Sequence, residues 1–163
     1  MPEQQWEQRL TALWTTLDDR PEEEFVAAVD ELTAELPDDD AAGAFERAAA
    51  RDSTGHSDLA VPLYRQALER GLTGERRRRA VIQLASSLRN TGDVATSVEL
   101  LEGELARTSD GLDDAVRAFL ALALVDSGRE REAVSHALIA LAPHLPRYQR
   151  STANYARALV EEE

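Results

Sequence analysis

The stretch from Gly55 to Leu68, GHSDLAVPLYRQAL, has a spacing that occurs twice more in the chain. Its glycine is followed five residues later by a small residue, nine residues later by a larger one and thirteen residues later by leucine. The later copies begin at Gly92 and Gly128, so the three glycines lie 37 and 36 residues apart. A fixed period of this size is typical of helical repeat proteins. This spacing therefore predicts the fold class.

Length and composition favour a single all-α domain. The 163 residues are enough to bury a continuous core. Alanine and leucine are common and aromatic residues make up only 5% of the chain, which suits close packing of helices rather than a sheet. Small residues also recur seven residues before each repeat glycine, at Ala48, Ala85 and Ala121, where two antiparallel helices can approach closely. Together with the repeated spacing they predict a right-handed α-solenoid of antiparallel helical hairpins, with about nine helices in one domain over residues 1–163.

Apolar periodicity and turn signals divide this domain into five parts. The first part has apolar residues at helical spacing that predict a helix over residues 3–17, after which Asp18 or Asp19 is expected to cap the next helix. The predicted parts are a divergent acidic N-terminal hairpin at 1–37, three repeat hairpins at 38–72, 73–109 and 110–145, and a C-terminal capping helix at 146–163.

The charge of the chain is concentrated at its N-terminus. The formal net charge is −13, and residues 1–40 carry 13 acidic and two basic residues, or −11. This balance argues against binding to nucleic acid, which requires a basic surface. No stretch approaches the roughly 20 apolar residues that a membrane helix needs, and the N-terminus has no signal-peptide pattern. We therefore expect a soluble cytoplasmic protein that contacts neither nucleic acid nor membrane.

The residue types that usually carry chemistry form no recognisable site. The chain has no cysteine, which excludes disulfides and thiolate metal ligands. The histidines His56, His136 and His144 lack a third ligand at suitable spacing. Ser135 adjoins His136, but neighbouring side chains on a helix diverge, so they do not form a nucleophile and base. We expect no metal, no cofactor and no enzymatic activity.

The repeated residues resemble the tetratricopeptide repeat. That family has a small residue in the first helix, glycine at the turn, alanine five residues later, an aromatic residue nine later and alanine twelve later. The resemblance covers about residues 41–160 and looks like a small bacterial family of compact, largely free-standing domains. It implies a structural, repeat-defining role for Gly55, Ala60, Tyr64, Ala67, Gly92, Gly128 and Ala133.

The resemblance also implies a function in protein–protein interaction. Such domains hold a peptide, a helix or a partner protein in a concave groove lined by the leading helices of the hairpins, and they are not catalytic. Two alternatives remain open. Trp6 and Trp14 of the first helix could pack between copies and produce a homodimer, or the acidic first hairpin could lie over an arginine-bearing groove and inhibit binding as an internal mimic of a ligand.

The candidate groove residues lie mainly after the run Arg76–Arg79. Four successive helical residues point in four directions, so the run itself is best interpreted as a solvated face that pairs with nearby acids. Polar residues at spacings of four, three and four would line the groove on one side of that helix. They are Arg79, Gln83, Ser86 and Asn90.

Two aromatic residues of other leading helices, Phe45 and Phe119, are further candidates for apolar pockets in the groove. Aromatic residues at helical spacing are more often part of the core, so this alternative stays open. The chain has no lysine, the residue that the family's carboxylate-clamp members use to hold an acidic peptide tail. The resemblance therefore does not imply a clamp of that type.

Overall fold

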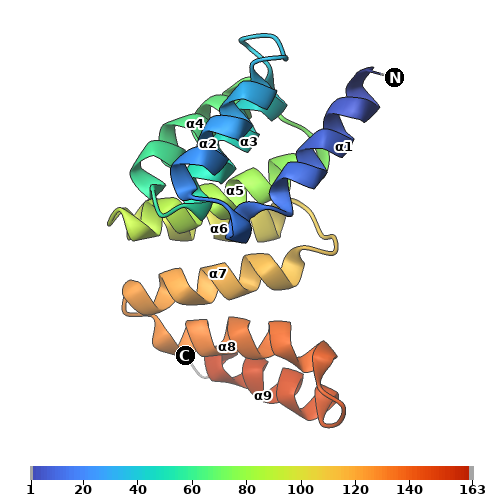
Figure 1. The fold of residues 1–163 in the computed structure, drawn as a ribbon. Coiled ribbons are helices and arrows are strands. Elements are labelled where there is room, and N and C mark those ends of the chain that lie inside the picture. Colours follow the sequence, from blue (N-terminus) through green and yellow to red (C-terminus); the bar gives the residue numbers. More distant parts are fainter. Residues whose placement is uncertain (1, 162–163) are drawn as a thin grey trace. The chain divides into compact units, whose positions relative to one another are not determined.

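The computed structural model describes residues 2–161, and every regular element in this range is helical (Figure 1). The prediction of an all-α helical repeat fold is confirmed. Two 3₁₀ helices, η1 (Leu17–Asp19) and η2 (Ala142–His144), follow α1 and α8. None of the helices within this range has the length and apolar character needed to cross a membrane. The nine α-helices of the described range are α1 (Pro2–Trp14), α2 (Glu22–Thr33), α3 (Ala41–Ser53), α4 (Ser57–Glu69), α5 (Gly74–Asn90), α6 (Val94–Arg107), α7 (Asp113–Asp126), α8 (Glu130–Leu141) and α9 (Gln149–Glu161).

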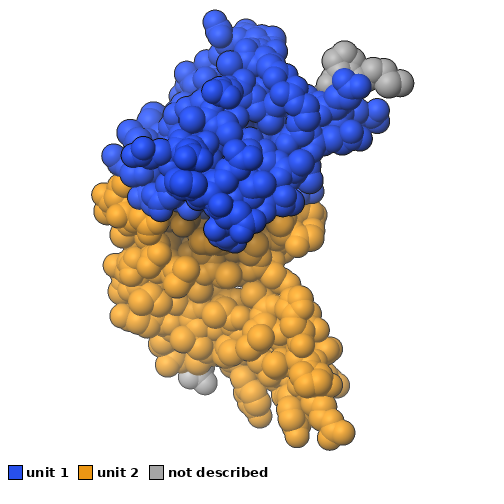
Figure 2. Space-filling model, viewed as in Figure 1, with its two compact units in different colours: residues 1–83 blue, residues 84–163 orange. Residues whose placement is uncertain are grey.

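The chain divides into two compact units, residues 1–83 and residues 84–163 (Figure 2). The division falls inside α5, between Gln83 and Leu84. Unit 1 therefore contains α1 to α4 and the first part of α5, and unit 2 contains the rest of α5 and α6 to α9. The hairpin predicted at 73–109 has residues in both units.

Unit 1 has two small apolar clusters at its N-terminal end. Their fully or nearly buried members are Trp6, Leu10 and Leu32 in the first cluster and Phe25, Val29 and Ala50 in the second. Trp14 packs against both, and its ring meets that of Phe25 edge-on with the centroids 5.1 Å apart. Burying one large apolar side chain contributes about 1.5–3 kcal/mol. These contacts hold α1 and α2 together and join α2 to α3.

Unit 2 is a succession of helices in which α6 packs on α7, α7 on α8 and α8 on α9. Val116, Leu120 and Leu124 are fully buried at intervals of four residues along α7. Small residues are buried on the two helices that follow, which allows close approach of the helix axes. Ala133 of α8 and Ala156 of α9 are examples.

The three turn glycines have the same backbone geometry. Gly55, Gly92 and Gly128 have φ angles of +83°, +96° and +76°, in the left-handed region that a side chain disfavours. In each turn the N–H of the next residue donates to the carbonyl five residues earlier, at 2.8, 2.8 and 2.9 Å. This is the hydrogen bond of a glycine-terminated helix. Each leading helix therefore ends in the same way, as the repeated spacing predicted.

The predicted end of the first helix is wrong. The helix ends at Trp14, three residues early, because the hydroxyls of Thr15 and Thr16 each donate to a backbone carbonyl of the preceding turn at 2.7 Å. Such local bonds compete with continuation of a helix. The chain then forms η1, which contains Asp18 and Asp19, so neither residue caps α2; that helix begins without a side-chain cap.

Candidate functional site

The turn glycines provide a common register for the leading helices α3, α5 and α7. One side of each leading helix is formed by four positions, which lie thirteen, nine, six and two residues before its glycine. Their spacings of four, three and four follow the helical period. We call these positions the register face. Its members are Ala42, Glu46, Ala49 and Ser53 in α3; Arg79, Gln83, Ser86 and Asn90 in α5; and Ala115, Phe119, Leu122 and Asp126 in α7.

The predicted polar residues thus lie on one face of α5, but they belong to different units. Arg79 and Gln83 are in unit 1 and are both half-buried. The guanidinium carbon of Arg79 lies 5.2 Å from the ring centroid of Phe45, within the range of a cation–π contact. The Oε1 atom of Gln83 is buried and accepts no hydrogen bond. In unit 2, Ser86 is half-buried and Asn90 is exposed.

The run of four arginines at the start of α5 does not form a solvated face. Arg78 is only 2% exposed, so that interpretation is wrong for this residue. Successive residues are turned by about 100° around a helix, and a helix packed among others cannot direct four in a row to solvent. The interpretation that the run pairs with acids does hold for Arg76, which forms ion pairs with two carboxylates.

Arg76 is the centre of a polar network that we call the Arg76 cluster, made by Glu7, Trp14, Glu46 and Arg76. The Nη1 and Nη2 atoms of Arg76 donate to the two carboxylate oxygens of Glu7, both at 2.7 Å. Its Nε donates to Oε1 of Glu46 at 3.0 Å. The Trp14 Nε1 donates to the other Glu46 oxygen at 2.9 Å. The cluster joins α1, α3 and α5 within unit 1.

The hydrogen bonds of this cluster favour the charged forms of Glu7 and Arg76. The hydrogen bonds from Arg76 lower the pKa of Glu7, against a smaller opposing effect of burial. The same bonds to Glu7 raise the pKa of Arg76. Glu46 is only 2% exposed, and both of its oxygens accept hydrogen bonds, which is the condition under which a carboxylate tolerates burial.

Phe45 is fully buried in unit 1, where it packs beside the repeat-defining Tyr64 with the ring centroids 6.1 Å apart. The hydroxyl of Tyr64 donates to a carboxylate oxygen of Asp52 at 3.2 Å. Burial, and after it the charge of Asp52, raises the pKa of Tyr64. Ala60 and Ala67 on the same helix are also fully buried. Phe45 therefore lies in the packed interior of the first repeat, beneath Arg79.

Phe119 is half-buried in unit 2, beside a stripe of exposed apolar residues that the sequence analysis did not single out. This stripe, which we call the α7 open stripe, consists of Ala118, Leu122 and Val125. Leu122 is 47% exposed and Val125 is 50% exposed. The signal available in the sequence was a second apolar row on α7, at spacings of four and three, besides the row that builds the core.

A polar pair borders the α7 open stripe at its C-terminal end. The Nε of Arg89 donates to Oδ2 of Asp126 at 2.6 Å, and Asp126 directly follows Val125 on α7. Both residues belong to unit 2. The stripe therefore has an apolar centre and a charged edge, which is the usual organisation of a protein-binding surface.

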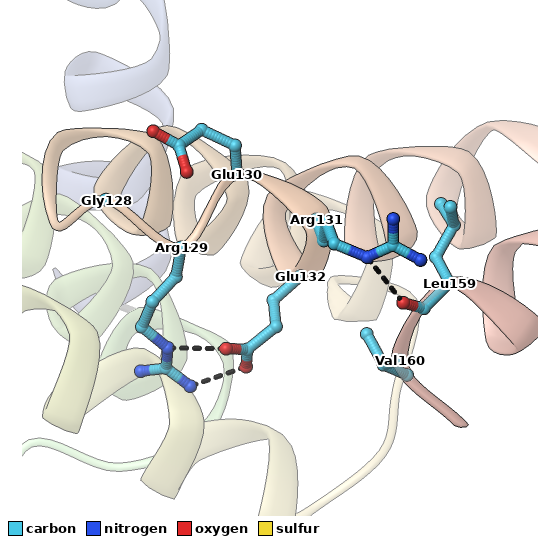
Figure 3. Close-up of a pocket in the computed structure, with 7 residues that line it drawn as sticks. All are labelled: Gly128, Arg129, Glu130, Arg131, Glu132, Leu159 and Val160. Atoms are coloured by element: carbon cyan, nitrogen blue, oxygen red, sulfur yellow. Dashed lines mark hydrogen bonds and ion pairs between the residues drawn. The ribbon is translucent and has the colours of Figure 1, made fainter. Parts of the chain in front are cut away.

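A separate pocket of about 520 Å³ lies where the start of α8 meets the end of α9 (Figure 3). Two arginines line it. Arg129 donates to both oxygens of Glu132, at 2.7 and 2.6 Å, and to Glu102 at 2.9 Å. Arg131 donates to the carbonyl of Leu159 at 3.1 Å. These bonds join α8 to α6 and α9, so the arginines have a structural role in unit 2.

The helical hairpins and their repeated glycine turns define a helical repeat protein. Residues 41–159 match the family described as "Tetratrico peptide repeat". The chain belongs to the tetratricopeptide repeat family, as its residue pattern predicted. Proteins of this family generally act as non-catalytic scaffolds for protein–protein interaction.

The same fold occurs in solved structures. The chain is similar to a protein of nearly identical TPR-like repeats from Podosopora anserina that is described as a kinesin light chain, and to a single-substitution variant of that protein. In both cases the TM-score is 0.72 and the identity is 20%, over 96% of this chain and 83% of the other. No curated protein matches the chain in sequence. These similarities establish the fold.

Proposed function

We propose that the chain is an interaction module whose leading helices bind a peptide or helix of a protein partner. The observation that carries this proposal is the α7 open stripe. α7 already buries one apolar row in the core of unit 2, and yet it exposes Leu122 and Val125 on another side. A second apolar row contributes nothing to the core, whereas burial against a partner would contribute about 1.5–3 kcal/mol for each large side chain.

The spacing of the α7 open stripe suggests the form of the partner segment. An amphipathic helix binds through apolar residues at intervals of three and four, and the stripe presents its own residues at these intervals. Phe119 provides a half-buried aromatic edge in unit 2, together with the polar Ser86 and Asn90 of α5. In unit 1, the half-buried Arg79 offers a cation as a separate polar contact, and Gln83 lies one turn further along the same face.

The test compares exposed apolar residues on a leading and a trailing helix. A partner segment is first identified by affinity purification and peptide arrays, and its affinity is measured by calorimetry. We expect Leu122→Ser to weaken binding by about tenfold or more. Val134→Ser is the matched control, because Val134 lies on α8 and is also 47% exposed. Equal affinity of the wild type and Leu122→Ser would contradict the proposal.

The polar candidates are tested with the same partner segment. We expect Arg79→Ala, Gln83→Ala and Asn90→Ala each to weaken binding less than Leu122→Ser, because a hydrogen bond to a partner replaces one to water at little net gain. If none of the three substitutions changes the affinity, the assignment of the α5 register face to binding is dropped, and α7 alone remains.

A second candidate function is autoinhibition by the N-terminal helix, and the Arg76 cluster favours it. Glu7 occupies the guanidinium of Arg76 with two hydrogen bonds of 2.7 Å, and both side chains are partly exposed. A carboxylate on a partner could form the same bidentate pair. Glu7 would then occupy the carboxylate-binding position on Arg76 until an acidic partner displaces it.

This candidate predicts that Glu7→Gln strengthens binding of an acidic partner peptide, because the peptide no longer competes with a charged carboxylate. Glu35→Gln is the matched control, since Glu35 forms an exposed pair with Arg9 in the same hairpin but lies outside the Arg76 cluster. Binding that is unchanged or weaker in Glu7→Gln would rule out autoinhibition through this contact.

Exchange of the first helix between copies stays a prediction without structural support. Trp6 is buried, and its Nε1 donates to the carbonyl of Leu32 at 2.9 Å. Trp14 donates to Glu46 within the Arg76 cluster. Both indole groups are therefore engaged inside unit 1, and pairing them between copies would first break these bonds.

A further inference from the structure

The C-terminal helix and the turn before it expose an unusual set of side chains in unit 2. Tyr148 and Tyr155 are each 75% exposed. The arginines beside them are exposed as well. Tyr148 also has a φ of +68°, a conformation that is strained for a residue with a side chain. We call this set, Arg147, Tyr148, Arg150, Tyr155 and Arg157, the basic–aromatic surface.

The positive charges of this surface are not neutralised within unit 2. Arg157 donates only to the amide oxygen of Asn154, at 3.2 Å, and within residues 4–161 neither Arg147 nor Arg150 forms an ion pair. By contrast, Arg129 in the same unit is bound to two carboxylates. Exposed tyrosine and arginine together are the residues that most often dominate the binding energy of protein interfaces.

A complementary surface exists in unit 1 of the same chain. Residues 18–24, DDRPEEE, hold five carboxylates and one arginine, and every one of these residues is exposed. They run from the last two residues of η1 through Arg20 and Pro21 into the first turn of α2. Within the described part of the chain none of the five carboxylates takes part in an ion pair. We call residues 18–24 the acidic segment.

We infer that the basic–aromatic surface of one copy binds the acidic segment of a second copy, so that chains associate head to tail. An arginine guanidinium matches a carboxylate with two parallel hydrogen bonds, and tyrosine adds apolar contact and a hydroxyl donor. The two surfaces differ, so the contact is heterologous, and each copy keeps one free surface for the next. The charge distribution favours a second copy as the partner of the basic–aromatic surface, because residues 1–40 of each copy carry a net charge of −11.

This association is weak and depends on salt. Each copy has a net charge of −13, which opposes close approach of two copies. The contact itself consists of exposed ion pairs, which salt screens over a Debye length of about 10 Å at 0.1 M. We therefore expect self-association at high protein concentration and moderate salt, and its loss at high salt.

The test is sedimentation velocity of the full chain with complementary variants. A tail variant, Arg147→Glu with Arg150→Glu, and a head variant, Asp18→Arg with Asp19→Arg, should each raise the dissociation constant of the pair about tenfold or more. An equimolar mixture of the two should associate again, because the intact acidic segment of the tail variant meets the intact surface of the head variant. Circular dichroism verifies that each variant is folded.

The matched control is Arg65→Glu with Arg107→Glu, which changes the net charge as the tail variant does but at exposed arginines outside both surfaces. It should retain self-association. A wild-type chain that stays monomeric at all concentrations would overturn the inference, even if it bound a polyglutamate peptide. The inference would also be overturned if the control variant lost self-association as much as the tail variant does. It would be overturned as well if the mixture of the tail and head variants stayed monomeric. The milder pair Arg147→Gln with Arg150→Gln replaces the tail variant should that variant fail to fold.

Discussion

The same face of a leading helix is closed in unit 1 and open in unit 2. Nine residues before the turn glycine, Glu46 of α3 is buried and bound to other residues, whereas Phe119 of α7 is half-buried. Six residues before it, Ala49 is buried and Leu122 is exposed. The backbone register of the two helices is the same, so their difference lies in the side chains and in what covers them.

The difference separates a repeat whose face takes part in folding from one that leaves apolar side chains exposed. In unit 1, α1 contributes Trp14 and Glu7, which with Arg76 hold Glu46 of the α3 register face in a hydrogen-bonded network. In unit 2, α7 carries large apolar side chains on the corresponding side, and within that unit they remain in contact with solvent. A closed face contributes to the free energy of folding, and an open apolar face is available to a partner.

The largest expected effect on stability comes from the aromatic core beside the closed face, in the interior of unit 1. Phe45→Ala should reduce the free energy of unfolding by about 4 kcal/mol, because it leaves a cavity beneath Arg79 and beside Tyr64. Leu122→Ala on the open face should change it by less than about 0.5 kcal/mol. Urea denaturation followed by circular dichroism measures both. Similar losses in the two variants would contradict the distinction between closed and open faces.

The next effect concerns the buried carboxylate. Glu46→Ala should lower the free energy of unfolding by about 3 kcal/mol. The reason is that it leaves the Trp14 N–H and the Nε–H of Arg76 without their acceptor. Gln83→Ala is the control at the equivalent position of α5, where the amide oxygen accepts no bond, and it should cost less than about 0.5 kcal/mol. If Glu46→Ala is as mild as Gln83→Ala in urea denaturation, the Arg76 cluster does not stabilise unit 1.

A smaller effect is the acid sensitivity of unit 1. Arg76 lowers the pKa of Glu7 below its ordinary value of 4.5, so the unfolded chain binds this proton more readily than the folded one. The stability from the pair is therefore present above pH 4.5 and lost as the pH falls through the lower, folded pKa. The loss is at most about 1 kcal/mol, because both side chains are partly exposed. Stability curves of Glu7→Gln should lack this component.

The smallest effect is expected in unit 2 and at a higher pH. Burial, and after it the neighbouring Arg117, lowers the pKa of His136 below 6.5. The Nη1 of Arg117 lies 3.0 Å from Nδ1 of His136, which accepts its hydrogen only while the imidazole is neutral. Stability should therefore decline as the pH falls below 6.5 toward the folded pKa. His136→Gln should remove this decline; a curve identical to that of the wild type would show that His136 does not cause it.

The fold could be predicted from sequence because its determinants are local. A left-handed turn requires glycine at one position, and Gly55, Gly92 and Gly128 all have that conformation. Apolar residues at intervals of three and four then indicate which segments are helices. The end of α1 was predicted wrongly, because the competing bonds of Thr15 and Thr16 are not visible in apolar periodicity.

The sites could be predicted only in part. The positions of Arg79, Gln83, Ser86 and Asn90 on one side of α5 follow from helical spacing alone. The partners of Arg76 do not, because Glu46 and Glu7 are 30 and 69 residues away in the chain.

By itself, the sequence determined the all-α repeat, its register and its turns, since these depend on residues a few positions apart. Only the tertiary structure decided which faces are closed. The segment AFLALALV of α7 is apolar throughout, and its sequence does not distinguish the buried Leu120 and Leu124 from the exposed Leu122 and Val125. Burial and ion pairing depend on side chains brought together from distant positions, so they are properties of the folded chain.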